Sequence, residues 1–145
     1  MINKRIETIN KKLYDVLMSD SRKIIDILNE LNIDFLYQFG SSVTGREHSN
    51  SDIDLAFYSQ EIYDNYKIFL LAQDLSRTLG KEIDLVQLRL ANTVFQKEVL
   101  SKSLVLFEKE KSKREEYEMI LLKKYTRLNE ERQEILENYE RRYNH

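Results

Sequence analysis

Two short motifs hold the residues best suited to chemistry. Gly40 is followed directly by Ser41, and Asp52 and Asp54 follow further along the chain. A glycine lets the backbone approach a phosphate closely, and the Ser41 hydroxyl with the N–H groups around Ser42 can donate hydrogen bonds to it. Two carboxylates at alternate positions of a strand leave the same face, roughly 7 Å apart, where a divalent cation relieves their repulsion. Metal-assisted chemistry on a nucleoside triphosphate requires this combination.

A third carboxylate, Asp84, lies in the alternating segment 82–87, which is typical of a further strand. If this strand neighbours the one that carries Asp52 and Asp54, Asp84 would complete a two-metal site and accept a proton from an attacking hydroxyl. Each motif alone is common in ordinary turns and solvated strand ends. Their order along the chain favours a catalytic site, because a turn leaves one strand and carboxylates follow on the next two.

The spacing of apolar residues predicts the elements that position these groups. We expect strands over 33–39, 52–58, 82–87 and 103–107. We expect helices over 4–17, from Ser19 or Asp20 to Leu31, over 61–79, and from Asn92 or Thr93 to Leu100. A short helical turn over 41–44, closed by Gly45, and a polar loop over 46–51 link the two motifs. In the helix over 61–79 the residues predicted to be buried are Tyr63, Tyr66, Phe69, Leu70, Ala72 and Leu75.

Residues 109–143 contain no helix breaker, so the sequence predicts one helix of roughly 50 Å at ~1.5 Å per residue. Such a helix is too long for a small body to cover. Part of it has apolar residues at alternating spacings of four and three, interrupted by Arg132: Leu121, Tyr125, Leu128, Ile135 and Tyr139. Acidic and basic residues nearly balance along it, which favours a protein partner or a second copy over RNA.

The bulk properties agree with one small α+β domain. The chain has 145 residues, a formal net charge of −2 and no cysteine, so neither a disulfide framework nor a thiolate metal site is possible. We expect a small mixed sheet with packed helices: a core over about 20–107 and the C-terminal helix over 109–143, within a single domain 1–145. No signal peptide or membrane span is expected, which predicts a cytoplasmic protein. The charge gives no general attraction to nucleic acid, so direct nucleic-acid binding is not expected.

These motifs carry a family resemblance. The Gly40-Ser41 pair, the later Asp52-Ile53-Asp54 segment and Ser51 just before it resemble the signature of the polymerase-β-type nucleotidyltransferase superfamily. Size and layout are similar to its minimal nucleotidyltransferases, the MNT antitoxins that pair with HEPN toxins. The resemblance covers about residues 20–107 and leaves the two terminal helices outside the specific motif.

The resemblance implies a role for each matching residue. Gly40 and Ser41, with Ser42 beside them, would hold the triphosphate of ATP. Asp52 and Asp54 would hold Mg²⁺, and Asp84 would complete the metal site. Many members carry an arginine just before the second glycine of the turn. This chain has threonine there and Arg46 after Gly45, which makes Arg46 the candidate for the cation on the phosphate side.

The implied function is Mg²⁺-dependent transfer of AMP from ATP to a tyrosine of a cognate HEPN ribonuclease toxin, which would make the chain an antitoxin. Two alternatives stay open. A nucleotidyltransferase of the aminoglycoside type would modify a small hydroxylated molecule, although such enzymes carry more chain for an acceptor pocket. A binding-only antitoxin would neutralise by contact, but it has no need of two adjacent carboxylates in a cleft.

Overall fold

The computed structural model describes residues 20–40, 43 and 52–143. Residues 20–27 are helical and run into η1 (Leu28–Glu30). The remaining elements are β1 (Phe35–Phe39), β2 (Ile53–Tyr58), α4 (Asn65–Leu79), β3 (Ile83–Gln87), η2 (Leu88–Leu90), α5 (Thr93–Ser101), β4 (Ser103–Glu108) and α6 (Lys111–Tyr143). The helix predicted over 4–17, most of the turn over 41–44 and the loop over 46–51 lie outside the described residues.

The described strands form one four-stranded sheet in the order β3-β2-β1-β4. The central strand β1 pairs antiparallel with both β2 and β4. β2 and β3 are parallel, and α4 connects them. The sheet is therefore mixed, as the sequence predicted, and its strands end within one or two residues of their predicted limits.

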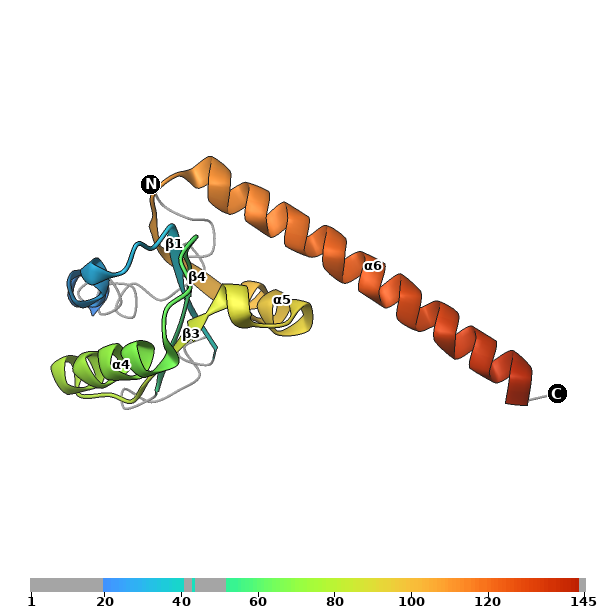
Figure 1. Cartoon of the computed structure of the whole chain (residues 1–145), viewed down its shortest axis with the longest axis horizontal. Coiled ribbons are helices and arrows are strands. Elements are labelled where there is room, and N and C mark those ends of the chain that lie inside the picture. Colours follow the sequence, from blue (N-terminus) through green and yellow to red (C-terminus); the bar gives the residue numbers. More distant parts are fainter. Residues whose placement is uncertain (1–19, 41–42, 44–51, 144–145) are drawn as a thin grey trace.

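Each face of the sheet supports its own apolar cluster because side chains alternate along a strand. Ile53, Leu55 and Phe57 face the helix over 20–27 and α4. Ala56, on the opposite face, packs with Tyr37 and with residues of α5 and α6. The side chain of Asp54 leaves β2 on this second face. Figure 1 shows α4 and the helix over 20–27 on one side of the sheet and α5 and α6 on the other.

The buried face of α4 was predicted in part: Ala72 and Leu75 are buried as expected. Tyr66, Phe69 and Leu70 are exposed, and the side chains that pack on the sheet are Ile68, Leu71, Ala72 and Leu75. Both sets recur at helical spacing, so the spacing alone does not show which set faces the sheet. The helix also begins later than predicted, because the Asp64 carboxylate accepts a hydrogen bond from the N–H of Tyr66 and caps the first turn. Its end was predicted correctly: Gly80 takes the left-handed conformation, with φ of 67°.

α6 is held to the sheet by a buried polar network. The Tyr37 hydroxyl of β1 donates a 2.8 Å hydrogen bond to Glu118. Arg114 donates to Glu118 and also to Glu108 of β4, so one guanidinium joins two carboxylates. Burial and the Glu118 charge raise the pKa of Tyr37, which therefore stays a neutral donor. The network fixes the first part of α6, and Figure 1 shows the rest of the helix extending beyond the sheet and α5.

Candidate active site

Two of the three predicted carboxylates meet directly. In the parallel register of β2 and β3, Asp54 lies opposite Asp84. The ladder begins one residue earlier, where the N–H of Ile53 donates to the carbonyl of Glu82 at 2.9 Å. Asp52 directly precedes β2 and is exposed, Asp54 is half-buried and Asp84 is exposed. The condition that the sequence left open, that the strand of Asp84 neighbours the strand of Asp54, is met.

The carboxylates of Asp54 and Asp84 are close enough for their negative charges to repel each other. Partial burial raises the pKa of Asp54, and the charge of Asp84 and a hydrogen bond with its carboxyl group raise it further. The charge of Asp52 acts in the same direction. A proton shared with Asp84, or a cation between the carboxylates, would relieve the repulsion. The site therefore favours a positive charge at this position.

Gly40 lies next to this pair, at the end of β1. Its φ is 81°, a conformation that side chains disfavour, and a Cβ placed there would lie 2.5 Å from Oδ2 of Asp54. Phe39, just before it, is the register partner of Asp54. The N–H of Gly40 donates to the carbonyl of Lys102, and its carbonyl accepts from the N–H of Val43. Gly40 therefore turns the chain sharply and leaves space for the Asp54 carboxylate.

The structure describes Gly40 but none of the other predicted phosphate-side residues. Ser41, Ser42 and Arg46 lie outside the described residues, as do Gly45 and Ser51. Among the residues that the structure describes, no group of three or more His, Cys, Asp or Glu side chains is arranged to enclose a metal ion. The donor chemistry of Asp54 and Asp84 nevertheless suits Mg²⁺, which takes few protein carboxylates and completes its shell with water and substrate phosphates.

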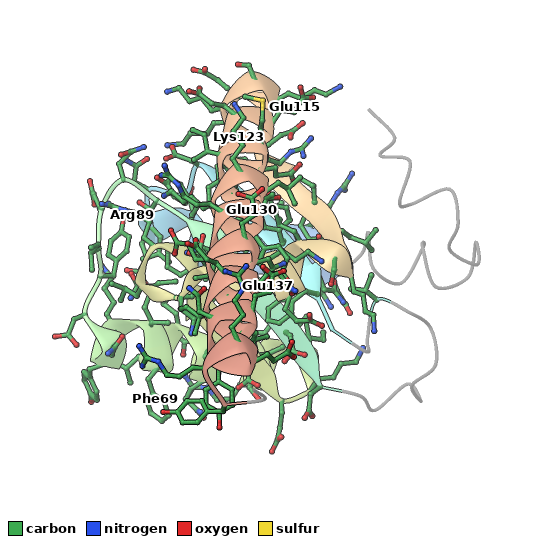
Figure 2. The ribbon with its side chains drawn as sticks, turned by 90° about the vertical axis from the view of Figure 1, so that its right-hand side faces the viewer. Phe69, Arg89, Glu115, Lys123, Glu130 and Glu137 are labelled. Carbon is green, nitrogen blue, oxygen red and sulfur yellow. The ribbon has the colours of Figure 1, made fainter. Side chains whose placement is uncertain are left out.

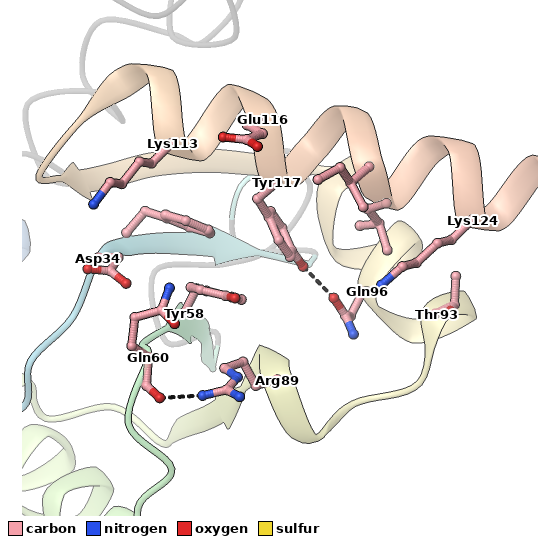
Figure 3. Close-up of a pocket in the computed structure, with 13 residues that line it drawn as sticks. Asp34, Tyr58, Gln60, Arg89, Thr93, Gln96, Lys113, Glu116, Tyr117 and Lys124 are labelled. Atoms are coloured by element: carbon pink, nitrogen blue, oxygen red, sulfur yellow. Dashed lines mark hydrogen bonds between the residues drawn. The ribbon is translucent and has the colours of Figure 1, made fainter.

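A separate cavity of about 530 Å³ lies on the same face of the sheet, between β1, η2, α5 and α6. Figure 3 shows its walls: Lys113, Tyr117 and Lys124 project from α6, and Tyr58 and Arg89 lie below them. The cavity lies at the Phe35 end of β1, whereas Asp54 pairs with Phe39 at the other end of that strand. Four residues of strand separate the two ends by roughly 13 Å. Tyr37, which is fully buried, lies between them, so the cavity is distinct from the carboxylate site.

Sequence reasoning missed this cavity and the network that anchors α6. The volume of the cavity falls within the usual range for small-molecule sites. The one available signal was the spacing of Arg114 and Glu118, four residues apart on a predicted helix. Nothing in the apolar strand around Tyr37 marks its hydroxyl as part of a polar network.

A mixed sheet with in-register carboxylates on adjacent strands and a glycine turn beside them defines a nucleotidyltransferase-like site. The chain belongs to the family described as polymerase beta, nucleotidyltransferase, whose model matches residues 22–112. Within the described part of the chain, no helix has the length and hydrophobicity needed to cross a bilayer.

Individual relatives agree with the family. The protein adenylyltransferase MntA of Shewanella oneidensis is 34% identical over 121 residues, which cover 82% of this chain and 86% of that protein. A crystal structure of a toxin–antitoxin with AMP-PNP contains a chain that is 33% identical, with a TM-score of 0.73 and coverage of 82% of this chain and 97% of that one. A tri-AMPylated S. oneidensis HEPN toxin in complex with its MNT antitoxin gives a TM-score of 0.69 at 30% identity, over 83% and 96% of the two chains.

Proposed function

We propose that this protein is an antitoxin that transfers AMP from ATP to a tyrosine hydroxyl of a HEPN-type ribonuclease toxin. One observation carries the proposal: Asp54 and Asp84 lie in register beside the Gly40 turn, in a chain 34% identical to a protein adenylyltransferase. We treat residues 1–145 as one nucleotidyltransferase domain. We infer that it acts in the cytoplasm, because the proposed ATP donor and ribonuclease target are both available there.

The reaction is a displacement at phosphorus. The tyrosine oxygen bonds to the α-phosphorus of ATP, and the bond from that phosphorus to the oxygen bridging to the β-phosphate breaks. Pyrophosphate leaves with the bonding electron pair, and AMP remains on the tyrosine. Asp84 accepts the hydroxyl proton, because it is exposed to an incoming acceptor and close to Asp54.

The other residues bind and orient the nucleotide. Asp52 and Asp54, with Asp84, would hold Mg²⁺, which when bound would offset negative charge on the phosphates. Gly40 keeps the Asp54 carboxylate in position, and Ser41 and Ser42 donate hydrogen bonds to the triphosphate. Arg46 supplies the cation on the phosphate side. Positioning and charge stabilisation provide most of the catalysis in reactions of this kind.

The acceptor is a folded protein that docks along α6. Met119, Ile120 and Leu122 are exposed on the first part of this helix, near the sheet that carries the carboxylates. The overall charge of −2 gives no attraction to RNA, which also favours a protein surface. Adenylate added near the toxin's ribonuclease site would silence it through bulk and negative charge, as phosphorylation does.

Co-expression with a HEPN-type protein encoded by a neighbouring gene tests the proposal. Mass spectrometry of the purified partner should find adenylate on a tyrosine when Mg²⁺ and ATP are present. Asp54→Asn should remove this modification. Asp26→Asn is the matched control, because Asp26 is an exposed aspartate on the helix over 20–27, on the other side of the sheet. A partner that is fully neutralised yet unmodified would show instead that the protein acts by binding alone.

The small-molecule alternative now has one observation in its favour, the cavity of about 530 Å³. Its distance from Asp54 argues against it, because an acceptor hydroxyl must reach the α-phosphorus to react. Incubation with aminoglycosides and labelled ATP separates the two functions. Labelled aminoglycoside in the absence of any protein partner would establish the alternative.

A further inference from the structure

The second half of α6 carries an apolar stripe that the described body does not cover. Every residue over 129–143 is exposed, including Ile135 at 67% and Tyr139 at 61%. The stripe continues the face that Leu121 buries against the sheet, and its members are the half-buried Leu128 and the exposed Ile135, Leu136, Tyr139 and Tyr143. Figure 2 shows Glu130 and Glu137 on the outward face of the helix. One side of this half-helix is therefore apolar and the other charged.

We propose that this half of α6 pairs with the same segment of a second copy, with the two helices antiparallel and centred on Ile135 and Leu136. The proposal does not depend on the proposed function. An isologous pair buries the same stripe from both copies, so no other partner is needed to cover it.

Charge placement selects the antiparallel arrangement. Arg132 interrupts the stripe, and a parallel pair in register would place it against Arg132 of the other copy. The antiparallel pair instead brings Arg132 close to Tyr139 and Glu140 of the second copy, where a cation–π contact and an ion pair are both available. Glu131 then comes close to Arg142 of the second copy. The same contacts occur twice, since the pair is symmetric.

The length and the area of the proposed overlap also suit a dimer interface. An overlap over residues 128–143 is about 24 Å long and lies within the part of α6 that extends beyond the sheet and α5 in Figure 1. The tyrosines of two copies would bury roughly 600 Å² at about 150 Å² each. With Ile135 and Leu136 the interface approaches ~1,000 Å², the lower limit for a specific interface. We therefore expect a dimer that dissociates on dilution.

Analytical ultracentrifugation of the purified protein over a range of concentrations tests the pairing. Glu131→Arg should weaken the dimer about tenfold, because two attractive pairs become repulsive. Adding Arg142→Glu to the same chain should restore it, and so should mixing the two single variants. Glu137→Arg is the matched control, since it makes the same charge change on the outward face. A monomer at all concentrations, or failure of the double variant to restore dimerisation, would overturn the proposal.

Two further measurements separate a second copy from another occupant. The chain has no cysteine, so Leu136→Cys introduces one thiol near the proposed two-fold axis. A short bifunctional maleimide should link two copies through it, whereas Glu137→Cys should not be linked. Ending the chain after Leu128 should give a monomer. If Leu136→Cys is linked only to a co-expressed toxin, the stripe belongs to that toxin and the self-pairing is wrong.

Discussion

A Cβ atom on Gly40 would lie 2.5 Å from Oδ2 of Asp54, closer than real Cβ contacts come. The glycine thus contributes to the carboxylate site as well as to the turn. It leaves the space that Asp54 occupies, and a side chain there would push the carboxylate away from Asp84.

Replacing Gly40 tests this relationship. Gly40→Ala should remove nucleotidyl transfer and should also cost roughly 1–2 kcal/mol of stability from the left-handed backbone. Gly80→Ala is the matched control, because Gly80 has φ of 67° but open space around its Cβ position. It should lose similar stability and keep full activity. Thermal unfolding and the AMP-transfer assay measure the two effects. Equal activity in both variants would show that the clash with Asp54 is harmless.

Replacing Asp54 should change stability in a pH-dependent way. Its pKa is raised by burial and by Asp84, so the protonated form is favoured in the folded state. The stability that this contributes is complete below the unfolded pKa and is lost as the pH rises through the folded pKa. Without divalent cations, Asp54→Asn should therefore gain stability over the native protein as the pH rises above about 4. Denaturant unfolding at several pH values checks the difference, and a constant difference would contradict it.

Replacing Asp84 should affect both transfer and the ionisation of its neighbour. Asp84→Asn should abolish or strongly slow AMP transfer. It should also lower the pKa of Asp54, because one charge that raises it is removed. Carboxyl-carbon NMR without metal reports the pKa directly. A lowered pKa with unchanged transfer would mean that the two aspartates are neighbours but that Asp84 takes no part in the reaction.

Removing the hydroxyl of Tyr37 should loosen the attachment of α6. Tyr37→Phe should cost about 1.5 kcal/mol, the low end for a hydrogen bond to a charged group, because Glu118 keeps its contact with Arg114. Tyr66→Phe, at a tyrosine that is 67% exposed, should change stability very little. Denaturant unfolding measures the free energy of unfolding of both variants. Equal values would show that the Tyr37 hydroxyl does not stabilise the fold.

The sequence predicted the order of the strands along the chain and the position of the carboxylates, because alternation and turn residues are local signals. It predicted that Asp84 belongs with Asp54 only if their strands were neighbours, and strand order depends on contacts distant in sequence. The prediction for α4 was wrong at Tyr66, Phe69 and Leu70 for a related reason, although Ala72 and Leu75 are buried as predicted. Phe69 and Leu71 are both apolar on the same helix, and only the sheet decides which one is buried. The polar anchor of α6 depends on a hydroxyl at Tyr37 that apolar patterning does not detect.

The parallel pairing of β2 with β3 also bears on how the protein folds. Asp54 and Asp84 are 30 residues apart, and they meet once the chain has completed α4 and returned to the sheet. The pairing of β1 with β4 instead joins residues that are 64 to 73 positions apart, so it is the less local of the two pairings. Because closing a longer loop costs more conformational entropy, the two aspartates should meet before β4 completes the sheet during refolding, and amide protection should appear in β3 before it appears in β4.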